Sequence, residues 1–413
     1  MDNLRVVVTG LGVISPNSAP GRDSFKEAVF GGFSGIKPIS LFDTSSFNSK
    51  LAGEIKDFDP GLILGREGLR VLDRSAKLLC CATQLALEDA KFKIDEENCR
   101  DVGIAIGNTL GSVQGICDFD KVAINEGPQY VNPSFFPNTV INAQVSQTSI
   151  KFKIKGFNVT ISNGFSSGID SIAYAANFIR SGRKSVVLAG GVEELSLHNF
   201  LGFYKTGLLS KQNQGAVELS CPFDKRRNGV IFSEGAVVLV LESLESALRR
   251  KAVIYAEIKG SASFFNTLSS GRCEVSGDSL KKAMRLAINK SGIDSNDVDC
   301  VMAGANSTQE FDKYEADSIN DVFGKNSLVK VSAIKSMLGE SFSASGAFQS
   351  ACALLAIENQ MVPPTINYQE KDSLCDLGIV SDKAVECSLN NVLVNAFGPN
   401  SGNSSLIISK YAG

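Results

Sequence analysis

Residues 159–170 read V-T-I-S-N-G-F-S-S-G-I-D, which predicts the end of a strand, a tight turn and the start of a helix. Many enzymes hold a nucleophile on such a turn, because the bend exposes one side chain and the helix N-terminus favours nearby negative charge. The chemistry of the chain therefore depends on which residue of this turn, if any, is a nucleophile.

Strand and helix patterns alternate on both sides of the turn. Apolar runs such as R-V-V-V-T-G, D-V-G-I-A-I-G and K-S-V-V-L-A-G-G-V predict buried strands. Segments such as K-L-L-C-C-A-T-Q-L-A-L-E-D-A-K and G-I-D-S-I-A-Y-A-A-N-F-I-R-S-G have helical spacing and end near Gly or Lys. The chain is therefore expected to have an α/β fold.

The second half of the chain echoes the first. The stretch K-V-S-A-I-K-S-M-L-G precedes S-A-S-G-A-F-Q-S-A-C-A-L-L-A-I, a helix pattern that starts with small residues and continues along an Ala-rich face, as S-S-G-I-D-S-I-A-Y-A-A-N-F-I does. Small residues allow close packing, so we expect two related halves that meet face to face. The predicted halves are residues 1–252 and 253–413, divided after the helix pattern L-E-S-A-L-R-R-K.

The composition narrows the classes of function. The chain has 413 residues, is 43% hydrophobic and has a net charge of −3, which argues against a general affinity for nucleic acid or anionic membranes. No apolar run approaches the roughly 20 residues that a membrane helix needs. The start, M-D-N-L-R-V-V-V-T-G, lacks the pattern of a signal peptide, so a cytoplasmic location is expected.

Cysteine and histidine usage limits the chemistry further. The ten cysteines are scattered without C-x-x-C spacing, which supports neither a disulfide framework nor a zinc site. Buried free thiols are expected instead, with no metal and no cofactor. The single histidine, His198, matters most, because acid–base chemistry near neutral pH commonly uses His.

Taken alone, G-F-S-S-G at residues 164–168 matches G-x-S-x-G, the nucleophile elbow of serine hydrolases. Ser166 would then be the nucleophile of a hydrolase or acyltransferase, and His198 would be the available base. Glu193 or Glu194 would have to serve as the acid. The alternative is that these small residues simply allow a tight turn and close helix packing, and a structural role is likewise the alternative for His198.

The wider sequence resembles the β-ketoacyl-acyl-carrier-protein synthases, the condensing enzymes of fatty acid and polyketide synthesis. The segments that carry the resemblance run in order along nearly the whole chain: V-V-V-T-G-L-G-V-I-S-P, F-F-P-N-T-V-I-N, I-K-G-F-N-V-T-I-S, S-V-V-L-A-G-G-V-E, C-P-F-D-K-R-R-N-G, S-E-G-A-V-V-L-V-L-E, I-K-S-M-L-G, S-G-A, V-P-P-T-I-N-Y and N-A-F-G. The resemblance implies the thiolase-like fold, with two similar βαβαβαββ halves in five layers, and an obligate dimer.

The resemblance also implies a catalytic site, and this chain departs from it at three positions. In the family, a Cys in a motif like T-A-C-A-T-G accepts the acyl chain, and two His side chains help to decarboxylate malonyl-carrier protein and stabilise the enolate. Phe165 stands at the Cys position, Gly304 at the first His position and Glu340 at the second. One oxyanion donor is typically worth about 3 kcal/mol of barrier, so these losses should abolish condensation.

Other family positions persist. Lys335 matches a structural lysine, and Asp312 and Glu315 match acidic positions after the first His motif. We expect these three to form a buried network that supports the fold, with a proton relay as the alternative, and a Lys335–Glu340 contact is possible. Pro399 stands where the family has a Phe that gates the acyl pocket, and it cannot act as the same swinging gate.

A subunit without this chemistry resembles the chain-length factor, or ketosynthase β subunit, of type II polyketide and aryl-polyene systems. The resemblance implies a heterodimer with an active ketosynthase, whose acyl tunnel the inactive subunit lines. Many chain-length factors carry Gln at the Cys position and this chain does not, which argues against a decarboxylating role. A homodimer that binds acyl-carrier protein or an acyl chain is a further alternative.

The resemblance places tunnel or interface residues in N-T-L-G-S-V-Q-G, residues 108–115, and beside it. The candidates are Thr109, Ser112, Val113, Phe135 and Phe136, with ordinary core packing as the alternative for the two aromatics. The interface should be large and apolar. Acyl-carrier protein should dock mainly on the active partner through basic residues; on this chain Arg226 and Arg227 are candidates, with a solvated loop as the alternative.

Overall fold

One mixed sheet of ten strands organises the chain, in the order β11-β10-β14-β15-β9-β1-β8-β6-β4-β5. The structure, a computed structural model, describes residues 4–213, 215–266, 278–325, 327–399 and 402–413. The five strands from the first part of the chain are β1 (Val6–Ile14), β4 (Val102–Gly107), β5 (Asn158–Ile161), β6 (Val186–Glu193) and β8 (Gly235–Ser243). The five from the second part are β9 (Ala256–Phe265), β10 (Cys300–Met302), β11 (Lys330–Ser332), β14 (Asn391–Phe397) and β15 (Gly402–Ser409).

The strand order shows the duplication that the sequence predicts. Read outward from its centre, each half of the sheet passes through two antiparallel strands and then three parallel ones. The halves are joined where β1 pairs with β9, through Val7 with Glu257 and Val8 with Ala256. The sheets of the two predicted halves are therefore joined by hydrogen bonds into one continuous sheet.

Helices form the layers on either side of the two half-sheets. They are α1 (Arg22–Phe30), α2 (Gly61–Leu64), α3 (Arg74–Asp89), α4 (Val113–Asn125), α5 (Ala143–Lys151), α6 (Ser167–Arg180), α7 (Leu197–Thr206), α8 (Leu244–Arg249), α9 (Ser279–Ser291), α10 (Gln309–Phe323), α11 (Lys335–Leu338) and α12 (Ser345–Asn359). Two small sheets complete the fold, β2 (Ile36–Pro38) with β3 (Leu51–Gly53) and β7 (Phe232–Ser233), and β12 (Met361–Val362) with β13 (Val385–Glu386).

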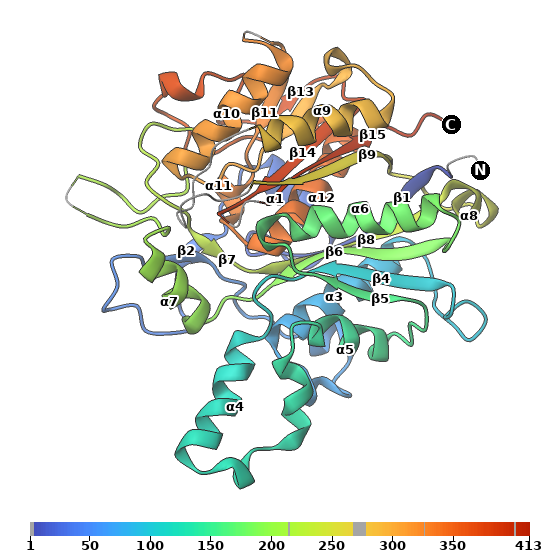
Figure 1. Cartoon of the computed structure of the whole chain (residues 1–413), viewed down its shortest axis with the longest axis vertical. Coiled ribbons are helices and arrows are strands. Elements are labelled where there is room, and N and C mark those ends of the chain that lie inside the picture. The colour runs from blue at the N-terminus through green and yellow to red at the C-terminus, as the bar shows by residue number, and fades with distance from the viewer. Residues whose placement is uncertain (1–3, 214, 267–277, 326, 400–401) are drawn as a thin grey trace.

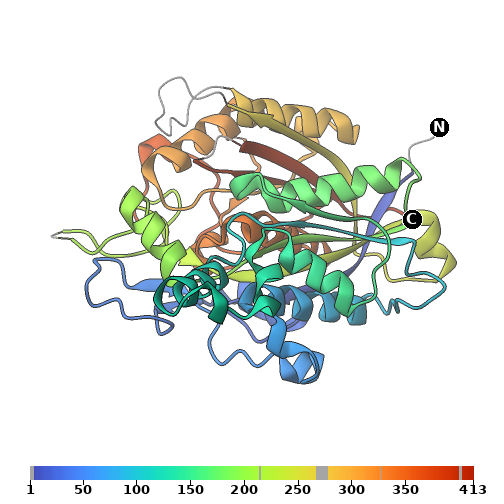
Figure 2. The same ribbon diagram turned by 60° about the horizontal axis from the view of Figure 1, so that its bottom comes forward.

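Five layers are visible from top to bottom in Figure 1. Helices α9 and α10 cover the outer face of the C-terminal half-sheet, α6 and α12 lie between the half-sheets, and α3 and α5 cover the outer face of the N-terminal half-sheet. Helix α4 and the turns after it project from the lower layer, and they lie in front when the molecule is turned (Figure 2).

The central layer consists of α6 and α12, which pack directly on each other. A Cβ atom at Gly168 would collide with the backbone of Ser343, and one at Gly346 would lie 2.7 Å from Cγ1 of Ile169. Glycine at these contacts lets the two helices approach closely. Helix α12 is buried on all sides over Ser345–Ile357, as expected for a helix that is apolar around its whole circumference. The predicted face-to-face packing of two small-residue helices is confirmed.

The turn quoted from the sequence has the predicted form. Strand β5 ends at Ile161, the 3-10 turn η4 spans Gly164–Ser166, and α6 starts at Ser167. Gly164 has φ of 66°, a left-handed conformation that glycine adopts without strain. In the described ranges of the chain, no helix is long and apolar enough to cross a lipid bilayer.

Candidate functional site

Phe165 lies in η4, at the position where the resemblance places the nucleophilic Cys. Its side chain is 5% exposed. Its ring meets the ring of Phe342 at an angle of 65°, with the centroids 4.7 Å apart, and the ring of Phe203 lies 6.4 Å away. An apolar ring held by its neighbours thus occupies the place where a thiolate would be needed.

Phe165 belongs to a group of four rings that we call the aromatic cluster: Phe165, Phe203, Phe232 and Phe342. Phe203 from α7 stacks on Phe342 with centroids 4.4 Å apart and planes at 15°. Phe232 from β7 packs on Phe342 at 4.8 Å. Phe342, in the turn η6 (Phe342–Ala344), has φ of 48° and is fully buried. The cluster therefore joins segments that are far apart in sequence into one solid aromatic core.

The former gate position lies against the same cluster. Pro399 is half-buried and follows Gly398, directly after β14. A Cβ atom at Gly398 would lie 2.5 Å from Cγ of Phe165, so the backbone there packs on the face of that ring. The backbone just before Pro399, the position at which the resemblance places a gate, is therefore in contact with the ring of Phe165.

Gly304, at the first His position, has no room for a side chain. A Cβ atom there would lie 2.7 Å from Cε1 of Phe397 and 3.1 Å from the carbonyl oxygen of Asn395. The backbone is nevertheless firmly held: its N–H donates to Glu315 (2.9 Å) and its carbonyl accepts from Lys335 (2.8 Å). The backbone at position 304 is thus held on both sides, while the space beside it excludes a larger side chain.

Glu340, at the second His position, forms a buried ion pair with Lys335. Its Oε2 lies 2.7 Å from Nζ of Lys335, and the two side chains are 1% and 3% exposed. Oε1 accepts hydrogen bonds from the N–H of Phe342 (2.9 Å) and the hydroxyl of Ser345 (2.7 Å), and Oε2 also accepts one from Nδ2 of Asn306 (3.2 Å). All of these partners donate hydrogen bonds to the carboxylate, which is thereby fixed in place.

Glu315 and Asp312 extend this network on α10. Glu315 accepts from the N–H groups of Gly304 and Ala305 and from the amide of Asn395. Burial raises the pKa of Glu315 to about 7, against the opposing effect of these donors. Burial likewise raises the pKa of Asp312 to about 6, although three backbone N–H groups and the nearby Arg227 favour its charged form. Both carboxylates accept hydrogen bonds from the backbone around Gly304, over residues 304–307.

Ser166 does not have the surroundings of a hydrolase nucleophile. Its side chain is fully buried, and its hydroxyl lies 2.9 Å from Asp170 and 3.1 Å from the carbonyl oxygen of Asn163. His198 is exposed on α7, and within the described part of the chain it makes no hydrogen bond to Ser166. The Ser166 hydroxyl therefore stabilises the first turn of α6 through its hydrogen bond to Asp170.

The other two residues proposed for a hydrolase triad, Glu193 and Glu194, are buried side by side at the end of β6. Burial raises the pKa of each to about 8. Glu193 contacts the backbone N–H groups of Thr109 and Leu110 and the hydroxyl of Ser343 (2.6 Å). Among the residues that the structure describes, neither carboxylate hydrogen-bonds to His198.

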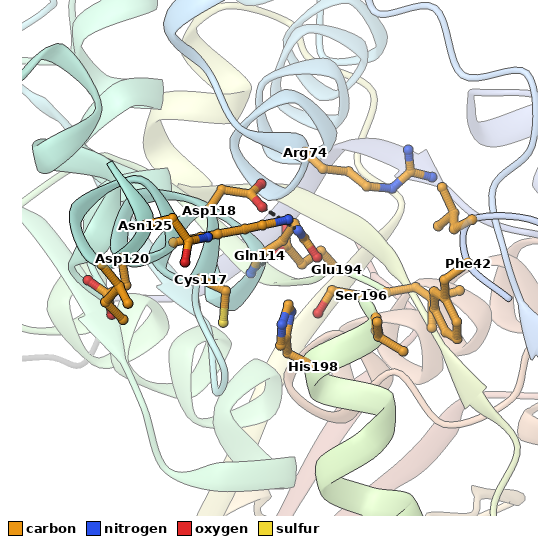
Figure 3. A pocket seen from close by; sticks show the side chains of 15 residues that line it. Phe42, Arg74, Gln114, Cys117, Asp118, Asp120, Asn125, Glu194, Ser196 and His198 are labelled. Carbon is orange, nitrogen blue, oxygen red and sulfur yellow. Dashed lines mark hydrogen bonds between the residues drawn. The ribbon is translucent and has the colours of Figure 1, made fainter. Parts of the chain in front are cut away.

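A cavity of about 790 Å³ lies between α4 and the start of α7. Figure 3 shows Cys117 of α4 and His198 of α7 close to each other in its lining, to which Glu194 and Arg74 also belong. Gln114 donates a hydrogen bond to Asp118 along α4 (2.9 Å). His198 thus faces a cavity that the sequence reasoning did not assign to it.

The predicted tunnel residues near the start of α4 have different surroundings. Thr109 is half-buried and donates to the carbonyl of Gly164 (2.7 Å), which ties this segment to the turn that carries Phe165. Ser112 is buried, and its hydroxyl contacts Asp73 and Gln144. Val113 is half-buried on the first turn of α4.

Phe135 and Phe136 lie in the turn η3 (Pro133–Thr139), which returns along α4. Their side chains are 42% and 59% exposed, so ordinary core packing does not describe them. Phe135 lines a second cavity of about 480 Å³ on the other side of α4, together with apolar side chains that include Phe119 and Val122. The two residues were singled out by the sequence as partner-facing candidates, and the structure leaves them on the surface.

The expectation for Arg226 and Arg227 is corrected by the structure. Arg227 is 2% exposed and donates to Asp372 (2.6 Å), so it is neither a docking residue nor part of a solvated loop. Arg226 makes two hydrogen bonds to Asp224 (2.8 and 3.0 Å). The sequence pattern shows two adjacent cations but not the acidic residues that the fold brings to them.

Sequence reasoning missed the residues that complete the site. Phe203 and Phe342 fill the space around Phe165, and Asn306 and Ser345 complete the shell of Glu340. The run of altered motifs could have directed attention to Phe342, two residues after Glu340, but no local signal connects Phe203 with it. Among the described residues, no group of three or more His, Cys, Asp or Glu side chains could hold a metal ion.

Comparisons with known proteins identify the family of the chain. Residues 3–247 match the family described as Beta-ketoacyl synthase, N-terminal domain, and residues 255–369 match Beta-ketoacyl synthase, C-terminal domain. A 3-oxoacyl-[acyl-carrier-protein] synthase 2 of Coxiella burnetii is 35% identical over 99% of each chain. The protein of the same name from Vibrio harveyi is 34% identical over 100% of each chain.

Solved structures show the same fold. "The ishigamide ketosynthase/chain length factor" superposes with a TM-score of 0.91 at 31% identity, covering 99% of this chain and 100% of that one. A type II PKS acyl-carrier protein in complex with its ketosynthase bound to the hexaketide gives 0.89 at 27% identity, with coverage of 99% and 100%. The thiolase-like fold is thus confirmed. Since the family matches span both halves of the duplicated fold, the chain belongs to the β-ketoacyl synthase family.

Proposed function

We propose that this chain is a non-catalytic, chain-length-factor-like subunit that pairs with an active β-ketoacyl synthase and shapes its acyl tunnel, in type II polyketide or aryl-polyene biosynthesis. The observation that carries the proposal is the ring of Phe165 at the nucleophile position, enclosed by Phe203 and Phe342. A benzyl side chain forms no thioester, so acyl transfer has no starting point on this chain.

The two other altered positions support the same proposal. Gly304 offers no side-chain donor, and a carboxylate at position 340 would repel the negative charge that develops on an enolate oxygen. Because the surrounding backbone is still held by Lys335 and Glu315, the scaffold persists without the chemistry. A protein kept folded in this way acts through a surface.

That surface is best placed along α4 and the turns after it. Large apolar side chains are exposed there in one continuous stretch of chain: Ile124, Tyr130, Phe135, Phe136, Val140 and Ile141. Exposed apolar groups of this size mark interaction surfaces. Strand β5, at the edge of the ten-stranded sheet, precedes the turn of Phe165 and pairs only with β4 among the described strands. An active ketosynthase covering this face would bury both features.

The cavities on the two sides of α4 lie at the same face. We place the wall of the partner's tunnel on this helix, near Val113 and the exposed rings of Phe135 and Phe136. The relative named as a ketosynthase/chain length factor supports this role, and the relatives named 3-oxoacyl-[acyl-carrier-protein] synthase 2 support it at the level of the family. Acyl-carrier protein would dock mainly on the active partner, since Arg226 and Arg227 are already ion-paired.

Co-expression with a ketosynthase encoded next to this chain tests the proposal. We expect a stable one-to-one complex by native mass spectrometry, with acyl groups transferred from acyl-carrier protein only to the partner. A monomer or homodimer that persists in the presence of the partner, or an acyl adduct on this chain, would overturn it. A fluorophosphonate probe that labels Ser166 would instead support a hydrolase.

A further inference from the structure

The sequence K-F-K occurs twice, at residues 91–93 and 151–153, and each copy closes a helix of the outer layer. After α3, Lys91 has φ of 48° and the N–H of Phe92 donates to the carbonyl of Leu87 (2.9 Å). After α5, Lys153 has φ of 55° and the next N–H closes the same type of bond, to Ser149 (2.9 Å). Both ends are Schellman-type caps, so the two motifs have fixed backbones.

The two motifs line one groove of about 480 Å³, which we call the K-F-K groove. Phe92 and Phe152 are half-buried in it, while three of its lysines are exposed and Lys151 is half-buried. Within the described residues, none of these four amines is within ion-pair distance of a carboxylate. Glu88 is the acid in the lining, and it accepts a hydrogen bond from Gln84 (2.6 Å).

The charge of this groove is opposite to that of the protein as a whole, which has a net charge of −3. A cation near a helix C-terminus offsets the helix dipole, and one lysine at the C-terminus of α3 and one at that of α5 would be enough for this purpose. Here each of the two C-termini has two lysines. The groove is therefore a fixed, electropositive hollow with aromatic rings in it, and it lies in the α3–α5 layer, away from the aromatic cluster.

We propose that the K-F-K groove binds an acidic amphipathic helix of a partner protein. Carboxylates of the helix would face the four amines, and an apolar side chain would enter between Phe92 and Phe152. Complementary charge of this kind sets specificity and the rate of association. Both rings are half-buried and pack against the core rather than standing free on the surface, which favours the side chain of a helix over the flat surface of a bilayer as the ligand. The proposal is independent of the pairing with a ketosynthase.

Fluorescence anisotropy of the full-length protein tests this inference. The probe is a fluorescein-labelled synthetic peptide of repeated Glu-Leu-Glu-Glu, about four helical turns long. We expect the double variant Lys93→Glu/Lys151→Glu to weaken binding by about tenfold or more, and wild-type binding to fall as salt is raised. The matched control is Lys225→Glu/Lys383→Glu, which changes the net charge equally at two exposed lysines elsewhere and should bind like the wild type.

Three outcomes would overturn the proposal. The first is unchanged peptide binding by the groove variant, and the second is an equal loss in the control variant, which would show a mere effect of net charge. The third is groove-dependent binding to phosphatidylglycerol vesicles without groove-dependent binding to the peptide, which would favour a lipid surface. Thermal unfolding of both variants, expected to match the wild type, verifies that each is folded.

Discussion

Nζ of Lys335 lies 2.7 Å from Oε2 of Glu340, and both side chains are almost fully enclosed. Removing one member of a buried ion pair leaves an uncompensated charge in a medium that solvates it poorly. We therefore expect Glu340→Gln to lower the free energy of unfolding by about 3–5 kcal/mol in urea denaturation followed by circular dichroism.

The Lys335–Glu340 pair also provides a control variant and an outcome that would contradict the prediction. Adding Lys335→Met to Glu340→Gln removes the stranded ammonium and should restore part of the stability, while Glu386→Gln at an exposed site should change little. If Glu340→Gln unfolds at the wild-type urea concentration, the carboxylate does not hold the former pocket together.

Phe165→Ala should destabilise the chain strongly, because it empties a buried site against the rings of Phe203 and Phe342. The expected loss is about 3–5 kcal/mol, measured by chemical denaturation. Phe33→Ala, at a ring that is 59% exposed, is the matched control and should cost far less. Similar losses in both variants would mean that the aromatic cluster is loosely packed.

Restoring the three catalytic side chain types should not restore condensation. In the triple variant Phe165→Cys/Gly304→His/Glu340→His, the side chain at position 304 collides with the ring of Phe397 and Lys335 loses its partner. Incubation with acyl- and malonyl-carrier protein should give no β-ketoacyl product by mass spectrometry. Product formation would show that the rest of the pocket is still competent.

Phe136→Asp should weaken assembly with the partner while leaving the stability of the isolated chain nearly unchanged. The ring is 59% exposed, so the variant alone should unfold within about 0.5 kcal/mol of the wild type. Its affinity for the co-expressed ketosynthase should fall at least about tenfold, as for an aromatic anchor of an interface. Phe33→Asp has the same exposed fraction in the free chain and is expected to bind normally; an equal defect there would place the partner elsewhere.

Stability should decrease as the pH rises, in part through Glu193. Burial raises its pKa from the ordinary value of 4.5 to about 8. At a pH between these two pKa values, the carboxyl group of Glu193 is ionised in the unfolded chain and protonated in the folded chain. Its contribution to stability is therefore complete below pH 4.5 and decreases as the pH rises to about 8. For one such group the slope is about 1.4 kcal/mol per pH unit.

Glu193→Gln should remove this contribution, because an amide does not titrate. The free energy of unfolding of the variant, relative to that of the wild type, should therefore rise between pH 5 and pH 8, as measured by urea denaturation at each pH. A constant difference across that range would show that the Glu193 carboxyl group is already ionised in the folded protein at pH 5.

Much of the fold was accessible from sequence because it rests on local patterns. The strand, turn and helix around Phe165 follow from β-type residues, a glycine with positive φ and small residues at a helix contact. The echo of that unit in the second half predicted the duplicated architecture. The joining of the halves into one sheet was not predicted, because the pairing of β1 with β9 depends on tertiary placement.

The candidate site could be predicted only in part from the sequence. The motifs identified Phe165, Gly304 and Glu340 and suggested a Lys335–Glu340 contact, which the structure shows, but the rings that pack on Phe165 come from elsewhere in the chain. Gly339 has φ of 80° and breaks the helix between Lys335 and Glu340, so no helical periodicity predicts their ion pair. Arg227 was misjudged for a similar reason, since its partner Asp372 is 145 positions away.

The packing around positions 165, 304 and 340 also limits which substitutions the fold can accept. Cysteine at position 165 would leave a hole beside the ring of Phe342, histidine at 304 would collide with Phe397, and histidine at 340 would leave the ammonium of Lys335 without its carboxylate. Each of these changes, made singly, is therefore expected to lower the stability of the fold at the same time as it adds a reactive group.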